Sequence, residues 1–300
     1  MNQNQTLFGA IEAGGTKFVC AVGNRSGDLL DQRRIDTRDP DTTLGEVRQY
    51  FESAQKRFGV ISAVGVGSFG PLDLRPASPS FGFITSTPKP GWRNIDLRGF
   101  LMRSLGRPVY LDTDVNAAAL AEHRWGAGWD LDSVAYVTVG TGIGVGLLHG
   151  GRPVHGLVHP ELGHLIVRRH PEDRGFAGIC PFHGDCLEGL ASGPAIQVRT
   201  GESLERAAAD AAIWEFAADY LGQLCATLVL SNSPQRILMG GGVMQQGRLF
   251  GAIQTRMHHW LRDYVQAAEL HAEHYVRAPG LGTLAGIKGA LSLCLAAEAA

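Results

Sequence analysis

Metal-binding and acidic side chains lie close together in one segment of the chain. It reads Glu-Leu-Gly-His at 161–164 and Cys-Pro-Phe-His-Gly-Asp-Cys-Leu-Glu at 180–188. Two cysteines and two histidines at this spacing suit one tetrahedral zinc ion. Because nothing in the pattern indicates an open coordination position, we expect a structural metal. The expected ligands are His164, Cys180, His183 and Cys186.

Two carboxylates flank this cluster. Glu161 and Glu188 could be ordinary surface acids, but beside a metal they would be held in place to accept hydrogen bonds from sugar hydroxyls. His164 could serve twice, with one ring nitrogen on the metal and the other toward a substrate. A chance spacing, with Cys180 in the core and His183 on the surface, is the alternative. A zinc ribbon for nucleic acid is disfavoured by the net charge of −2.

Glycine-rich turns follow apolar runs at three places, 12–17, 138–146 and 240–244. Glycine lets backbone N–H groups approach phosphate oxygens, while Thr and Lys add a hydroxyl donor and a positive charge. The first turn lacks the GxxxxGK[ST] spacing of a P-loop. Each could also be an ordinary tight turn, and the third alone favours that interpretation. The first two match each other, and this favours phosphate binding.

An acidic pair stands at a predicted junction of a strand and a helix, in Asp112-Thr113-Asp114-Val115-Asn116. Asp114 could simply cap the helix. It could also be a general base that accepts a proton from an attacking hydroxyl. Taken alone, the motif favours the cap. Asp112 would then be a supporting partner or another turn residue.

A strand, a glycine turn and a second strand, followed by a helix, occur twice along the chain. This predicts two similar α/β halves that face each other across a cleft. The assignments rest on apolar periodicity and on glycine and proline breaks. Strands are expected at 7–13, 18–23, 29–37, 60–66, 109–111, 133–139, 145–149 and 236–239, and helices at 42–58, 96–105, 114–125, 204–230, 249–264 and 281–297.

Composition sets further bounds. A chain of 300 residues is long enough for two domains. The odd count of five cysteines argues against a disulfide framework, and Cys20, Cys225 and Cys294 lie in apolar runs typical of a core. No signal-peptide pattern or membrane-spanning run is present, so a cytoplasmic location is expected.

These motifs together resemble the ROK family, named for repressor, open reading frame and kinase. The resemblance covers nearly the whole chain. The family's first phosphate loop resembles residues 12–17, and its signature segment resembles residues 140–164. Its zinc motif resembles residues 180–188, and its adenosine motif resembles residues 240–243. Within the family the chain looks most like bacterial fructokinases. Glu12, Asp112-Thr113 and His183 depart from the commoner glucokinase pattern, and the stretches 68–71 and 85–92 are also similar to fructokinases.

The resemblance implies a ribonuclease H-like, actin-type ATPase fold with two similar α/β domains around a cleft. The expected domains are 1–115, with the last helix (about 281–300) packing back on it, and 116–280, which carries the zinc loop 161–188. Asp114 carries over as the catalytic base, and Glu161, His164, Glu188 and position 113 (Thr113) as sugar contacts. ATP binding is expected at Gly14, Gly15, Thr16, Lys17, Gly140, Thr141, Gly142, Pro194, Gly240, Gly241, Gly242, Val243 and Met244.

The expected reaction is ATP-dependent phosphorylation of D-fructose to fructose 6-phosphate, with Mg²⁺ near Glu12. Phosphorylation of mannose, glucose or an N-acetylhexosamine is the alternative substrate choice. A sugar-responsive repressor is a second alternative, disfavoured because the first strand starts near Leu7 and leaves no room for a preceding DNA-binding domain. Sugar and ATP are the expected partners, without nucleic acid or membrane, and a homodimer is the family expectation.

Overall fold

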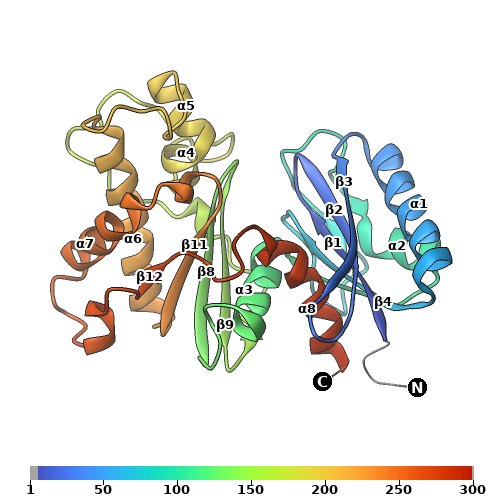
Figure 1. Cartoon of the computed structure of the whole chain (residues 1–300). Coiled ribbons are helices and arrows are strands. Elements are labelled where there is room, and N and C mark those ends of the chain that lie inside the picture. Colours follow the sequence, from blue (N-terminus) through green and yellow to red (C-terminus); the bar gives the residue numbers. More distant parts are fainter. Residues whose placement is uncertain (1–5, 299–300) are drawn as a thin grey trace. The chain divides into compact units, whose positions relative to one another are not determined.

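The computed structural model describes residues 6–298, which group into two compact units (Figure 1). The first unit consists of the chain up to Trp129, the segment Arg152–His159 and the C-terminal part from Thr283. The second consists of Asp130–Gly151 and Pro160–Gly282. The domain limits expected at residues 115 and 280 stay a prediction.

A five-stranded sheet forms the centre of the first unit, in the order β3-β2-β1-β4-β7. Strand β1 pairs antiparallel with β2 and parallel with β4, and β4 pairs parallel with β7. Because parallel strands end at the same edge, the residues that follow β4 and β7 emerge together there. The strands are β1 (Leu7–Ala13), β2 (Lys17–Gly23), β3 (Leu29–Asp36), β4 (Ile61–Ser68) and β7 (Val109–Thr113).

Helices cover both faces of this sheet. On one face, apolar side chains of α1 (Pro40–Phe58) and α2 (Leu97–Leu105) join strand residues in one buried cluster. On the other face, α8 (Ala285–Glu298) packs on β1, β2 and β4. A Cβ on Gly65 would lie 1.8 Å from the carbonyl oxygen of Ala290, so glycine is required for this close approach. Helix α3 (Asp114–Trp125) packs against α8.

The second unit repeats part of this arrangement. Its strands run in the order β9-β8-β11-β12, with β8 antiparallel to β9 and parallel to β11, and β11 parallel to β12. These directions match those of β2-β1-β4-β7, as the repeated pattern in the sequence predicted. The strands are β8 (Ser133–Val139), β9 (Ile143–His149), β11 (Arg236–Gly240) and β12 (Val276–Arg277).

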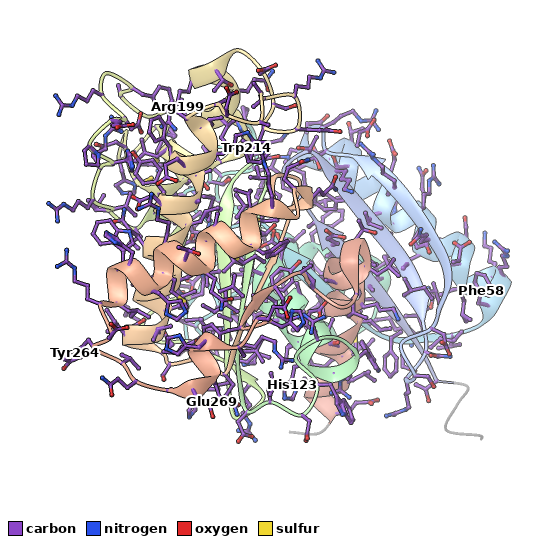
Figure 2. The ribbon with its side chains drawn as sticks, turned by 60° about the vertical axis from the view of Figure 1, so that its left-hand side comes forward. Phe58, His123, Arg199, Trp214, Tyr264 and Glu269 are labelled. Atoms are coloured by element: carbon purple, nitrogen blue, oxygen red, sulfur yellow. The ribbon has the colours of Figure 1, made fainter. Side chains whose placement is uncertain are left out.

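Helix α6 packs against α7 in the second unit. The two helices span Ile213–Ser231 and Arg248–Leu261, and α6 begins beside Trp214, labelled in Figure 2. The remaining elements are α4 (Leu187–Ala191), α5 (Gly193–Thr200), the short strands β5 (Phe83–Ile84), β6 (Ile95–Asp96) and β10 (Arg152–Pro153), and the 3-10 turns Leu162–His164, Val243–Gln245, Ala268–His271 and Gly282–Leu284.

One predicted helix starts later than expected. The helix predicted from residue 204 begins only at Ile213. Before it, Leu204 is buried and the indole N–H of Trp214 donates to the carbonyl of Ala208 at 2.9 Å, so these residues form turns. Arg248 of α7 also donates to the carbonyl of Ala209 at 3.1 Å, so tertiary contacts here override the helix propensity of an alanine-rich stretch.

The cysteines predicted to lie in the core do so. Cys20, Cys225 and Cys294 have no exposed surface. Among residues 6–298 the structure contains no helix of sufficient length and apolarity to cross a bilayer.

Candidate functional site

The first glycine turn, Gly14–Lys17, joins β1 to β2. Gly14 donates its backbone N–H to the carbonyl of Lys17 at 2.9 Å, and the hydroxyl of Thr37 donates to the carbonyl of Gly14 at 2.7 Å. Gly15, Thr16 and Lys17 are exposed. The turn is therefore fixed at its base and presents its tip to solvent.

Two carboxylates of the first unit interact near the ends of its strands. Glu12 is the penultimate residue of β1 and Asp114 is the first residue of α3, directly after β7. Burial raises the pKa of Glu12, against the opposing charge of Lys17. Burial and the negative charge of Glu12 raise the pKa of Asp114 to about 7. A carboxylate with this pKa exchanges a proton readily at neutral pH.

Helix α3 is capped by Thr113, not by Asp114. The Thr113 hydroxyl accepts a hydrogen bond from the backbone N–H of Asn116 at 3.1 Å. The cap that the sequence favoured for Asp114 is therefore wrong. The Asp114 carboxylate lies in the first helical turn, where its Oδ1 accepts from the backbone N–H of Val115 at 2.9 Å.

A histidine that the sequence analysis did not select lies beside Asp112. The Nε2 of His155 is 3.2 Å from Oδ1 and 3.0 Å from Oδ2 of this buried carboxylate. The hydrogen bond to Asp112 raises the pKa of His155. Nothing in the sequence marks the pair, because 43 positions separate the two residues.

Three segments that were predicted to bind nucleotide come together in the second unit. The backbone N–H of Gly193 donates to the carbonyl of Gly140 at 2.8 Å, which joins the second glycine turn to the start of α5. Pro194 lies in the first turn of that helix, which Ser192 caps. Gly241, with φ +95°, lies so close to β8 that a Cβ would be 2.4 Å from the carbonyl oxygen of Val139. The predicted residues 140–142, 194 and 240–244 therefore lie on adjacent loops.

The four predicted zinc ligands also come together. Their ligand atoms all lie within 4.8 Å of one another. The Nδ1 of His164 is 3.7 Å from the sulfur of Cys180 and 3.5 Å from that of Cys186, and the Nδ1 of His183 is 3.7 Å from the sulfur of Cys180. A tetrahedron with ordinary Zn–S and Zn–N bonds has S–N edges of about 3.5 Å. The donor set and its spacing therefore fit a tetrahedral zinc ion.

The two acids flanking this cluster have different surroundings. Oε2 of Glu188, on α4, accepts a hydrogen bond from the backbone N–H of Ile143 at 2.9 Å. A Cβ on Gly142 would lie 2.6 Å from the same oxygen. Glu188 therefore links the zinc loop to the second glycine turn. Glu161 is exposed, and its carbonyl accepts from the backbone N–H of His164 at 3.0 Å.

A second buried cluster holds the outer part of the zinc loop. The hydroxyl of Tyr220 donates to Asp173 at 2.5 Å, and Arg199 of α5 (Figure 2) lies 3.0 Å from the same carboxylate. The guanidinium of Arg199 also stacks over the ring of Phe176 at 4.2 Å. Residues 173–176 are thus attached to α5 and α6 without any metal.

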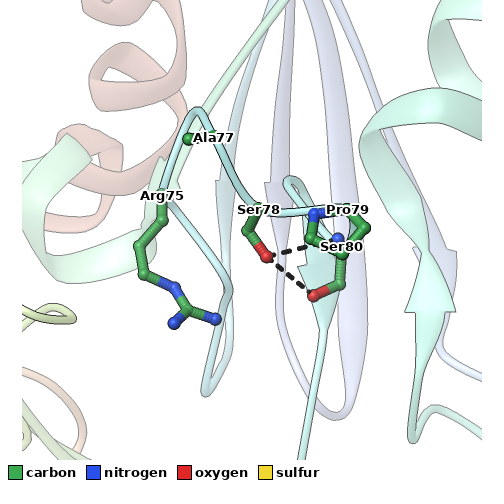
Figure 3. A pocket seen from close by; sticks show the side chains of 5 residues that line it. All are labelled: Arg75, Ala77, Ser78, Pro79 and Ser80. Atoms are coloured by element: carbon green, nitrogen blue, oxygen red, sulfur yellow. Dashed lines mark hydrogen bonds between the residues drawn. The ribbon is translucent and has the colours of Figure 1, made fainter.

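A cavity of about 450 Å³ lies beside the loop that contains Arg75, Ala77, Ser78, Pro79 and Ser80 (Figure 3). None of the predicted site residues lines it. The serine hydroxyls donate to buried Asp73, which also accepts from Arg75, and these bonds hold the pKa of Asp73 far below its usual range. The polar groups of this loop satisfy one another, so we assign the cavity no role in the chemistry.

Comparisons with known proteins agree with these features. The model of the ROK family matches residues 8–297. The chain is 44% identical to a fructokinase of Zymomonas mobilis over 99% of each chain. It is 41% identical to a fructokinase of Pediococcus pentosaceus over 97% of this chain and 98% of that one.

The fold is shared with solved structures. The crystal structure of a ROK hexokinase from Thermus thermophilus superposes with a TM-score of 0.78 at 30% identity, over 98% of this chain and 100% of that one. This similarity confirms the predicted actin-type ATPase fold.

Proposed function

The chain belongs to the ROK family, and we propose that it is an ATP-dependent fructokinase that forms fructose 6-phosphate and ADP. One observation supports fructose as the substrate: four fructokinases share 38 to 44% identity with the chain over 91 to 99% of its length. Glucokinases share 27 to 29%. ATP is the phosphoryl donor, as expected for a sugar kinase of this family.

We assign proton removal from the attacking hydroxyl to Asp114. Its pKa of about 7 lets a large fraction of the carboxylate be ionised at neutral pH while it remains basic enough to take a proton. The 6-hydroxyl of fructose is the group that Asp114 would orient. Catalysis of phosphoryl transfer depends mostly on positioning and electrostatic stabilisation. The main requirement on Asp114 is therefore that its carboxylate be held in a fixed position.

The glycine turns would hold the phosphates. The turns Gly14–Lys17 and Gly140–Gly142 would each supply backbone N–H donors from residues other than Gly14 and Gly140, whose own N–H groups bond within the turns, and Lys17 adds a positive charge. The 240–244 segment and Pro194 would contact the nucleoside. Bound Mg²⁺ would neutralise developing charge on the phosphates. Glu12, whose pKa burial raises, fits a place near that ion through water.

Sugar binding would fall to residues around the zinc cluster. The ligands His164, Cys180, His183 and Cys186 would hold a structural zinc ion. With Nδ1 of His164 facing the cysteine sulfurs, its Nε2 is left for a sugar hydroxyl. Glu161, Glu188 and Thr113 complete the proposed set of contacts. The expected homodimer and cytoplasmic location stay predictions.

A coupled assay of ADP release with Mg-ATP tests the function. Fructose, mannose, glucose, N-acetylglucosamine and N-acetylmannosamine would be compared with zinc-replete protein. The highest kcat/KM with fructose is the expected result. A higher value with another hexose would contradict the substrate but keep the kinase, and no turnover with any sugar would contradict both.

A further inference from the structure

Asp112 organises the turn between β7 and α3. This buried carboxylate accepts hydrogen bonds from the backbone N–H of Thr113 at 2.7 Å and from the side-chain amide of Asn116 at 2.8 Å, both through Oδ1. Asn116 is buried as well, and its own backbone N–H is the one that Thr113 caps. Asp114 lies between these contacts. The orientation of its carboxylate therefore depends on how Asp112 is held.

His155 is the residue that meets Asp112 from outside the turn. It comes from Arg152–His159, the segment that belongs to the first unit although the chain before and after it belongs to the second. Its Nε2 reaches both carboxylate oxygens, at 3.0 and 3.2 Å, and lies 3.4 Å from the side-chain amide of Asn116. The donors from Thr113 and Asn116 are neutral amides, whereas the imidazole can carry a positive charge.

A buried carboxylate needs such a partner, because neutral donors alone compensate its charge poorly. The same segment is attached a second time, where Nε2 of His159 accepts the backbone N–H of Leu72 at 3.0 Å. His155 is therefore presented to Asp112 by a segment that is anchored again at its last residue, His159.

We infer that His155 is a positioning residue for phosphoryl transfer, which acts through Asp112 to hold the first turn of α3 and so the carboxylate of Asp114. The inference rests on the proposed function, in which Asp114 is the base. It requires no contact between His155 and the substrate.

The test compares His155→Ala, His155→Gln and the control His274→Ala, an exposed histidine of the second unit. Loss of His155 should lower kcat roughly ten- to a hundredfold, since small displacements of a catalytic group have effects of this size. KM for ATP should stay near wild type, whereas the melting temperature should fall in the alanine variant, because the buried Asp112 loses its charged partner. Glutamine, which can place a neutral donor where Nε2 lies but carries no charge, should restore kcat only in part. Unchanged kcat in the alanine variant would overturn the inference.

A double-mutant cycle shows whether the effect passes through Asp112. In an Asp112→Asn background, His155→Ala should change kcat by less than about threefold, because the partner charge is already gone. Full additivity would overturn the inference and indicate direct contact of His155 with the sugar.

The interaction between His155 and Asp112 can also be measured without turnover. In an NMR titration the pKa of His155 should fall in Asp112→Asn, since Asp112 is the charged group found to face its ring. An unchanged His155 pKa would overturn the inference even in an active kinase. Failure of the wild type to phosphorylate any sugar would instead overturn the proposed function.

Discussion

The hydroxyl of Thr113 accepts a hydrogen bond from the backbone N–H of Asn116 at 3.1 Å and thereby caps helix α3. This contact releases Asp114 from the capping role that its sequence position suggested. The Asp114 carboxylate instead interacts electrostatically with Glu12, whose charge helps to raise its pKa. Division of the two tasks between neighbouring residues makes a carboxylate at a helix start available for proton transfer.

Asp114→Asn should lower kcat about 10²- to 10⁴-fold, the usual contribution of a general base. Mg-ATP affinity should stay within a few-fold of wild type, because no part of the proposed phosphate loops is changed. Single-turnover kinetics and equilibrium nucleotide binding would measure the two quantities. Asp41→Asn, an exposed acid in the first turn of α1, is the matched control. Turnover within a few-fold of wild type in Asp114→Asn would show that the base is a different residue.

The raised pKa of Asp114 predicts the pH dependence of activity. At saturating Mg-ATP, kcat/KM for fructose should fall about tenfold per pH unit below pH 7, as the carboxylate becomes protonated. A rate profile from pH 5 to pH 9 measures it. A flat profile down to pH 5 would contradict this environment for Asp114.

The raised pKa of Asp114 should also make the stability of the protein depend on pH, in the direction opposite to activity. The folded pKa of about 7 exceeds the unfolded value of about 3.9, so between these values the native state keeps a proton that the unfolded state has lost. The contribution of Asp114 to stability therefore falls as pH rises from about 4 to 7. Asp114→Asn, which cannot ionise, should gain melting temperature relative to wild type at pH 8 and not at pH 4. An equal difference at the two pH values would contradict the assignment.

The sequence predicted those parts of the fold that depend on local patterns. Strand β1, the bounds of α3 and the repeated strand–turn–strand unit follow from apolar periodicity and glycine turns, and the structure confirms them. The start of α6 at Ile213 and the two-residue strand β12 did not follow, because long-range contacts decide them. Periodicity carries no information about such contacts.

In the candidate site, too, features set by local spacing were predictable and features set by long-range contacts were not. The spacing of His164, Cys180, His183 and Cys186 suggested one metal cluster, and their side chains do meet. The hydrogen bond from Ile143 to Glu188 and the pairing of His155 with Asp112 were not predictable. Each joins residues more than 40 positions apart that carry no shared motif.

Removal of one metal ligand tests the zinc cluster. Cys180→Ser should lose most of the bound zinc and raise KM for fructose roughly tenfold. The effect on KM for ATP should be smaller, because the loop carries most of the proposed sugar contacts and meets the second glycine turn through Glu188. Elemental analysis and steady-state kinetics measure these changes. Cys225→Ala, a buried thiol of the same unit, is the control and should keep its zinc. An unchanged zinc content in Cys180→Ser would refute the ligand set.

The extent of unfolding in Cys180→Ser is also predictable. Hydrogen exchange should rise at residues 177–186, where the loop depends on the metal. It should rise less at 173–176, which Arg199 and Tyr220 hold through Asp173 and Phe176. Equal loss of protection in both segments would show that the second cluster does not stabilise the loop by itself.

Adjacent glycines in the third turn provide a test of the nucleotide segment. Gly241 has φ +95°, and a Cβ there would lie 2.4 Å from the carbonyl oxygen of Val139, whereas a Cβ on Gly242 would meet no atom within 4 Å. Gly241→Ala should therefore destabilise the protein by about 1 to 3 kcal/mol, through backbone strain and the clash with β8. Denaturant unfolding measures this cost.

Gly242→Ala is the matched control for stability and at the same time the test for the nucleotide. Its free energy of unfolding should stay within about 1 kcal/mol of wild type, the usual scale for a glycine-to-alanine change without a clash. Its KM for ATP should nevertheless rise, because the added methyl group would stand where the proposed nucleoside contact needs bare backbone. A Gly242→Ala variant with unchanged stability and unchanged KM for ATP would place the nucleoside elsewhere in the second unit, and the 240–244 turn would then be a purely structural connection between β11 and the residues that follow it.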